Sequence, residues 1–255
     1  MKTYAVTIGA LVLVCSFAGV AYADHTWGGY HWARTADPLT LQLGDGVKSV
    51  AWDTALAQAS SDWSLSTVLD TVVVASAVNP RVCRATNGRV EVCNSKYGNN
   101  GWLGIAQIWV TGGEHITQGV VKLNDTYFNR SPYNTPAWRN LVMCQEVGHT
   151  FGLDHQDEDF ANENLGTCMD YTSDPSTNGH PNTHDYEELE AIYAHLDFFD
   201  TAKATSGTQR ARDVDVSERS EWGKEVRHDS RGNSSVYRRD LGDGQAIFTF
   251  VTWAD

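Results

Sequence analysis

The feature that most constrains this chain is the segment 144–171, which begins Cys-Gln-Glu-Val-Gly-His and carries a second histidine six residues later. Glu146 and His149 stand three residues apart, so they share one face of a helix. Gly152 allows the backbone to turn, which lets His155 return toward His149. The spacing predicts a metal site built from a helix and the turn that follows it.

This segment resembles the zinc signature of the metzincin peptidases, His-Glu-x-x-His-x-x-Gly-x-x-His followed by a methionine turn. The matching residues are Glu146, His149, Gly152, His155 and Met169, while Gln145 stands in place of the first histidine. The resemblance implies an α+β fold with a mixed twisted sheet of about five strands, an antiparallel edge strand, a zinc helix, a Met-turn and a closing C-terminal helix. It also implies Zn2+ as cofactor and a peptide or protein as substrate.

The resemblance assigns the metal to His149, His155 and Gln145. An amide oxygen can coordinate zinc, but it is neutral and a weaker donor than imidazole, so we expect a lower zinc affinity. Three outcomes are open: Gln145 binds the metal through its amide oxygen, another side chain supplies the third ligand, or the site holds no metal. His180 and His184, in the loop after the Met-turn, are candidate replacement ligands, and His31 is a third candidate.

Two further roles follow from the resemblance. Glu146 is expected to be the general base that takes a proton from the water and hands it to the leaving amine. Tyr171 lies two residues after Met169, as does a tyrosine that reaches the zinc in astacin-like and serralysin-like metzincins. We expect it to be a further ligand or to stabilise the oxyanion, with Met169 as an apolar floor.

Two functions remain open. The first is a secreted zinc-dependent endopeptidase that hydrolyses peptide bonds with metal-activated water. The second is a catalytically inactive pseudo-peptidase that acts as a protein- or peptide-binding module. Glu146 favours the enzyme, and Gln145 favours the binding module.

Residues 1–23 have the pattern of a secretory signal peptide: a basic start, an apolar run over Ala5–Val20 and a small-x-small cleavage site at Ala21–Ala23. No later stretch approaches the roughly 20 consecutive apolar residues that a membrane-spanning helix needs. We therefore expect a soluble, secreted protein that begins at Asp24.

Four cysteines follow the predicted leader, and an even count in an exported chain indicates two disulfides with three possible pairings. We favour Cys83 with Cys93, because the sequence Thr86–Arg89 between them resembles a hairpin turn. That leaves Cys144 with Cys168, next to the helix and the Met-turn. A cysteine ligand to the metal is the alternative.

The formal net charge is −13, and residues 201–255 carry equal numbers of acidic and basic side chains, so the acidity lies before residue 201. An acidic catalytic region argues against nucleic acid and anionic membranes as partners. We expect a monomer. The acidic residues Asp157, Glu158, Asp159 and Glu163 predict a solvated loop, with a structural Ca2+ site as the alternative.

Hydrophobic periodicity predicts the remaining elements. The expected strands are 38–43, a buried 68–77, 102–110 and 116–123, and the expected helices are 47–63, 137–150 and 185–196. The resemblance places the substrate-binding edge strand at Trp102–Ala106, with Gly104 and Ala106 small enough for a peptide to approach. An interior strand is the alternative.

The chain divides by composition into a catalytic domain at 24–200, a linker at 201–220 and a C-terminal appendage at 221–255. The linker is rich in Ser, Thr, Arg and Asp. The appendage has a turn at Gly242–Gly244 followed by the β-branched and aromatic run Ala246–Val251, which predicts a small hairpin without recognisable chemistry.

Overall fold

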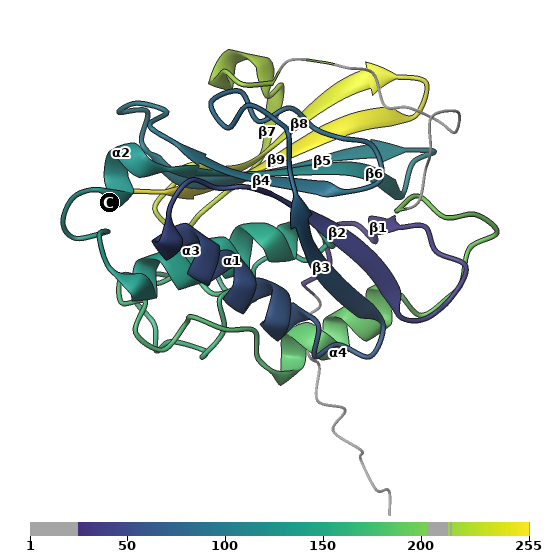
Figure 1. Ribbon diagram of the computed structural model, residues 1–255, viewed down its shortest axis with the longest axis horizontal. Coiled ribbons are helices and arrows are strands. Elements are labelled where there is room, and N and C mark those ends of the chain that lie inside the picture. Colours follow the sequence, from purple (N-terminus) through teal and green to yellow (C-terminus); the bar gives the residue numbers. More distant parts are fainter. Residues whose placement is uncertain (1–24, 203–213, 215, 255) are drawn as a thin grey trace, which may run out of the picture.

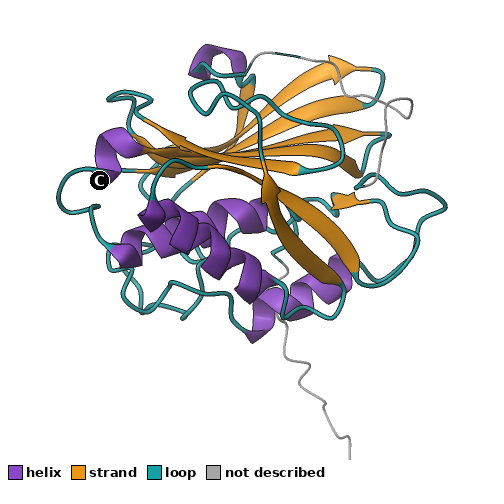
Figure 2. Ribbon diagram, viewed as in Figure 1, coloured by secondary structure: helices purple, strands orange, loops and turns teal. Residues whose placement is uncertain are grey.

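The structure is a computed structural model that describes residues 25–202, 214 and 216–254. The predicted leader and most of the predicted linker lie outside the described residues. The described chain is an α+β fold, in which one twisted mixed sheet carries its long helices on one side (Figures 1 and 2). Among the described residues, no helix combines the length and apolar character needed to cross a membrane.

Within the described residues the sheet has nine strands: β1 (His31–Trp32), β2 (Leu39–Gly46), β3 (Leu69–Ala75), β4 (Val90–Ser95), β5 (Trp102–Thr111), β6 (His115–Asn124), β7 (Lys224–His228), β8 (Ser234–Gly242) and β9 (Gln245–Trp253). Their order is β3-β2-β4-β6-β5-β9-β8-β7, and β1 pairs with β6. The half from β3 to β6 is parallel, and the half from β6 to β7 is antiparallel. The expectation of about five strands is wrong, because the C-terminal segment adds three strands to the same sheet.

The helices are α1 (Val50–Trp63), α2 (Asp125–Phe128), α3 (Pro136–His149) and α4 (Thr183–Ile192), with a 3-10 turn at Arg219–Glu221. Each long helix starts at a side-chain cap: Ser49 for α1, Thr135 for α3 and Asn182 for α4. The predicted apolar stripe of α1, from Trp52 to Trp63, is buried. The elements that surround the zinc signature are therefore set by local patterns.

Two local predictions are wrong. The run 68–77 is not buried, because β3 has only β2 as a neighbour and leaves Val72 and Val73 41% and 38% exposed. Cys83 and Cys93 are bonded, but not across a hairpin: Cys93 lies in β4, which runs parallel to β2 and β6. A β-branched run favours a strand without saying which neighbours the strand finds.

The most consequential difference concerns β5. All ten of its residues are buried, and it pairs antiparallel with β6 on one side and with β9 on the other. The expected free edge at Trp102–Ala106 is therefore wrong, since Gly104 lies opposite Thr252 and Ala106 opposite Phe250.

The C-terminal segment also differs from the small separate hairpin that its sequence predicted. Phe248 and Phe250 of β9 pack into the core on the helix side of the sheet, while Ile247 and Val251 pack on the other side. A strand that is apolar on both faces must be covered on both faces. Part of the predicted linker belongs to that cover, because Val216 is buried and its carbonyl accepts hydrogen bonds from other segments.

Candidate metal centre

Helix α3 brings Gln145, Glu146 and His149 beneath β5, and all three side chains are almost fully buried. The helix comes this close because β5 has a glycine at the point of contact. A Cβ atom on Gly104 would lie 2.6 Å from Glu146 Oε1 and 2.6 Å from Val142 Cγ1. The small size of Gly104 therefore serves helix packing in this structure rather than the approach of a substrate.

The turn after α3 has the predicted geometry. Gly152 has a φ of +100°, and a Cβ atom there would lie 2.0 Å from the carbonyl oxygen of Tyr30, so only glycine fits. The chain then returns, and His155 Nε2 lies 3.0 Å from His149 Nε2. The two rings meet edge to face, with centroids 4.5 Å apart. The structure thus brings together the two predicted histidine ligands.

The opposite nitrogens of both rings are engaged. His149 Nδ1 lies 2.9 Å from the carbonyl oxygen of Leu153, and His155 Nδ1 lies 3.1 Å from Glu158 Oε1. These oxygens accept, so each Nδ1 carries a hydrogen, and the two Nε2 atoms point at each other. Burial, with a smaller contribution from His155, lowers the pKa of His149 well below its ordinary value, which keeps that ring neutral.

This arrangement fits zinc. Two nitrogens bound to one tetrahedral Zn2+ at about 2.0–2.1 Å stand about 3.3 Å apart. The observed separation of 3.0 Å between the facing Nε2 atoms is close to that value. Two bare lone pairs at this distance repel each other, so the contact is made either through a proton on one Nε2 or through a metal ion between them. Oxygen acceptors on the outer nitrogens are also the usual partners of metal-bound histidines.

Gln145 is turned toward the C-terminal strand. Its Oε1 accepts a 2.7 Å hydrogen bond from the Thr252 hydroxyl. Its Nε2 is buried and has no hydrogen-bond partner in the part of the chain that the structure describes. An orphaned buried amide is costly in a purely structural role, so its position calls for another explanation.

Glu146 is enclosed by other protein groups. Its side chain is fully buried, and neither carboxyl oxygen has a well-formed hydrogen bond to the described residues. Burial raises the pKa of Glu146 to about 8, and the nearby Thr252 hydroxyl only partly opposes that effect. A general base has to be ionised, so Glu146 can take that role only when the site opens to water and the effect of burial falls. A perturbed, unpartnered carboxyl beside two convergent imidazoles is typical of a functional site.

Tyr171 and Met169 lie near the histidines, as predicted. The Tyr171 ring centroid lies 4.2 Å from that of His155, and its hydroxyl lies 3.5 Å from the carbonyl oxygen of Val251. Burial raises the pKa of Tyr171 well above its ordinary value, so its hydroxyl stays a donor. Met169 lies against α3 at Gly148, where a Cβ atom would stand 2.7 Å from the methionine sulfur.

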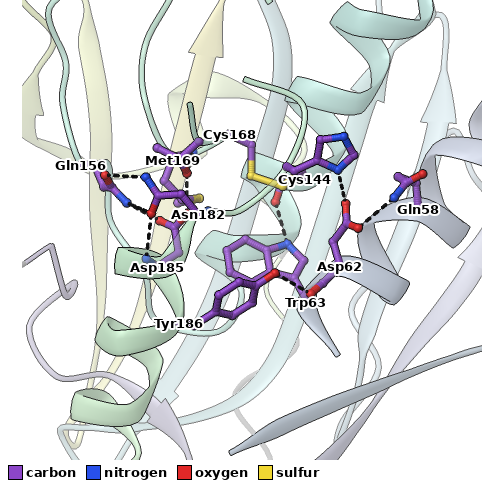
Figure 3. Close-up of a disulfide and its surroundings, with 12 residues drawn as sticks. Gln58, Asp62, Trp63, Cys144, Gln156, Cys168, Met169, Asn182, Asp185 and Tyr186 are labelled. Atoms are coloured by element: carbon purple, nitrogen blue, oxygen red, sulfur yellow. Dashed lines mark hydrogen bonds and ion pairs between the residues drawn. A yellow bond between two sulfur atoms is a disulfide. The ribbon is translucent and has the colours of Figure 1, made fainter. Parts of the chain in front are cut away.

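The floor of the site is tied to the helix by a disulfide between Cys144 and Cys168 (Figure 3). The indole of Trp63, from α1, donates a 3.1 Å hydrogen bond to the carbonyl of Cys144. Both disulfides that the sequence favours are therefore present, and neither leaves a thiol in the described chain that could serve as a metal ligand.

The candidate replacement ligands have other neighbours. His180 Nδ1 lies 2.7 Å from Asp62 Oδ2, the His184 ring lies against His25, and the His31 ring lies against His115. These positions do not support any of the three histidines as the third zinc ligand. In the acidic loop, Asp157 and Asp159 accept hydrogen bonds from backbone amides, and the calcium site stays a prediction.

The sequence interpretation missed the residues that cover the site. The Phe250 ring stacks on His149 at 4.5 Å with an interplanar angle of 8°, and Thr252 holds Gln145. Arg227 of β7 forms an ion pair with Asp154, next to His155. One signal was available: apart from Thr249, Ala246–Val251 is apolar without alternation, which is typical of a strand buried on both faces.

No protein-family model matches the sequence, and no curated protein matches it. Solved structures with similarity include high choriolytic enzyme 1, a hatching-enzyme zinc protease from medaka fish (Oryzias latipes), and myroilysin. The first is 10% identical with a TM-score of 0.35, covering 64% of this chain and 94% of the enzyme. The second is 12% identical with a TM-score of 0.38, covering 65% and 84% respectively. Similarities this weak support no conclusion about the activity of this chain.

Proposed function

We propose that the chain is a secreted zinc-dependent endopeptidase whose cleft is closed in this conformation by its own C-terminal strand. One observation carries the proposal: His149 Nε2 and His155 Nε2 converge to 3.0 Å while both Nδ1 atoms are anchored on oxygen acceptors. Bound zinc would supply a Lewis acid that lowers the pKa of water toward about 7.

The protein's own residues divide the remaining work. His149 and His155 hold the metal, and Gln145 is the third ligand through its amide oxygen. Glu146, adjacent to a ligand, accepts the proton of the attacking water and passes it to the leaving amine. Tyr171, beside His155, has a protonated hydroxyl that can donate a hydrogen bond to a developing oxyanion.

Access to these residues depends on β9. Phe250, Val251 and Thr252 contact His149, Tyr171 and Gln145, respectively. The same strand fills the hydrogen-bonding edge of β5, opposite Gly104 and Ala106. An extended substrate can therefore reach Glu146 only after β9 has left β5. Its departure would also remove the Thr252 hydroxyl from the oxygen that Gln145 needs for the metal.

The second candidate function is a binding module without hydrolysis. It is favoured by the same hydrogen bond, because Gln145 Oε1 is already engaged by Thr252 and is a weak donor to a metal. In that case β9 is a permanent part of the sheet, and the histidine pair is a relic of a metal site. The two candidates differ in one measurable respect, which is turnover that depends on Glu146.

The test compares the wild type with Glu146→Gln on a denatured protein substrate, with and without a chelator. We expect zinc in both proteins and, once β9 has been displaced, turnover only in the metal-loaded wild type. The matched control is Glu163→Gln, which alters an exposed carboxylate of the acidic loop. Turnover that survives both the chelator and Glu146→Gln contradicts the catalytic assignment.

A second experiment asks whether β9 must leave. A specific protease site placed within residues 203–213 allows the folded chain to be cut and the C-terminal fragment to be separated in mild denaturant. We expect activity to appear on separation and to disappear when the fragment is added back. Zinc-loaded protein that stays inactive after separation supports the binding module.

A further inference from the structure

A second group of histidines lies away from α3, where β1, the start of β6 and the chain after α4 meet (Figure 1). It consists of His31, His115, His195 and Asp197, here called the β1 cluster. His31 and His115 are direct partners in the β1–β6 pairing. Asp197 is fixed against the same segment, because its amide donates to the carbonyl of Arg34 and its Oδ2 accepts from the Arg34 amide.

The three imidazoles surround one carboxylate. Asp197 Oδ1 lies 3.2 Å from His115 Nε2 and 3.7 Å from His195 Nε2, and Asp197 Oδ2 lies 3.6 Å from His31 Nε2. The His31 ring centroid lies 5.0 Å from that of His115 and 4.9 Å from that of His195. The ligand atoms of His31, His115 and Asp197 all lie within 4.8 Å of one another.

The informative atom is His31 Nε2. The His31 side chain is 1% exposed, and its Nδ1 lies 2.9 Å from the carbonyl oxygen of Gly29, so Nδ1 carries the hydrogen. Nε2 has no hydrogen-bond partner among the described residues, and it faces the Asp197 carboxylate. A bare lone pair that faces a carboxylate at 3.6 Å is repelled, and either a proton on the ring or a metal ion between the two atoms removes that repulsion.

We propose that the β1 cluster binds a structural Zn2+ through His31, His115, His195 and Asp197. His31, His115 and Asp197 supply three converging ligand atoms, and the exposed His195 ring, 3.7 Å from Asp197 Oδ1, would supply the fourth ligand of a tetrahedral zinc site. Ca2+ and Mg2+ prefer sites made of oxygen. With His195 bound, no position is left for a water molecule, so this zinc would be structural. It joins three segments that are far apart in the sequence: β1, the start of β6 and the chain after α4.

The proposal is independent of the peptidase assignment, and the experiment keeps the two apart. The background is the full chain with His149→Ala and His155→Ala, which removes the other histidine pair. We expect this protein to bind about one Zn2+ per chain, and Co2+ to give the visible absorption of tetrahedral coordination. Zinc should also raise its melting temperature, because the metal binds only the folded chain.

Two variants then test the ligands. His195→Ala removes a side chain that is 58% exposed and should leave folding intact, yet we expect zinc to bind at least tenfold more weakly. Asp197→Asn keeps an acceptor for the Arg34 amide and should also weaken binding. His228→Ala, on a surface histidine of β7 that is 59% exposed, is the matched control and should change nothing.

Three results would overturn the proposal. The first is a background protein without stoichiometric zinc. The second is zinc affinity that is unchanged in His195→Ala. The third is a melting temperature that ignores zinc and rises as the pH falls from 7.5 to 5.5. That last outcome would mean that a proton on His31, and not a zinc ion, faces the Asp197 carboxylate.

Discussion

The helix pair, His149 and His155, and the β1 cluster use the same local device in different settings. In both, Nδ1 of a buried histidine is held by an oxygen, and Nε2 faces another potential ligand. The helix pair comes from one helix and its turn, whereas the β1 cluster comes from three separate segments. The helix pair also has an adjacent buried carboxyl, Glu146, that no hydrogen bond in the described chain satisfies. We therefore expect catalysis at the helix pair, where the unpaired carboxyl of Glu146 lies close to the histidines. We expect only a structural role for the β1 cluster, whose carboxylate faces the histidines themselves.

The strongest way to break this comparison is Glu146→Gln. If Glu146 is the general base, its loss should lower turnover by about 10²–10⁴-fold while zinc remains bound. The measurement is kcat on an unfolded protein substrate after β9 has been displaced, together with metal content by mass spectrometry. Equal turnover in wild type and variant would mean that the helix pair, like the β1 cluster, has only a structural role.

The next largest effect is expected from Gln145→His. An imidazole in place of the amide adds a better zinc donor, so we expect zinc affinity at the helix pair to rise at least tenfold, by roughly 1.4 kcal/mol or more. Competition with a chromogenic chelator measures the change. The β1 cluster should keep its affinity, and a rise at both sites would show that they are not independent.

Gly104→Ala separates helix packing from substrate access. The added Cβ would stand 2.6 Å from both Glu146 Oε1 and Val142 Cγ1, and overpacking of this kind costs about 1–3 kcal/mol. Gly179→Ala is the control, because its nearest neighbour would be Asn140 Cβ at 3.7 Å. Urea unfolding measures the free energy of unfolding of both variants. A variant at residue 104 as stable as the control would show that β5 and α3 are not in close contact.

The smallest effect is expected from Thr252→Val, which removes the hydroxyl that Gln145 accepts from and keeps the shape of the side chain. A buried hydrogen bond contributes about 0.5–1.5 kcal/mol, so the free energy of unfolding should fall by that amount. Zinc affinity at the helix pair should not fall, because the amide oxygen loses a competitor. A fall in zinc affinity would mean that the Thr252 hydroxyl orients Gln145 toward the metal.

The sequence predicted much of the fold near the zinc signature. The helical stripe of α1, the existence of strands β5 and β6 and the convergence of His149 with His155 depend on residues close in the chain, where spacing fixes geometry. The same reasoning failed for β3 and for the segment around Cys83, because both depend on neighbours that a strand pattern does not specify. It also gave Gly104 a role at an open edge that the structure covers.

The sequence alone determined the local devices: the glycine turn that returns His155, the side-chain caps and the run of apolar residues at 246–251. Only the tertiary structure decided that this run pairs with β5 and closes the site, and that four residues far apart in the chain meet at the β1 cluster. The physical reason is that a period of 2 or 3.6 residues fixes the face on which a side chain lies. The partner of that face depends on which buried surfaces fit together.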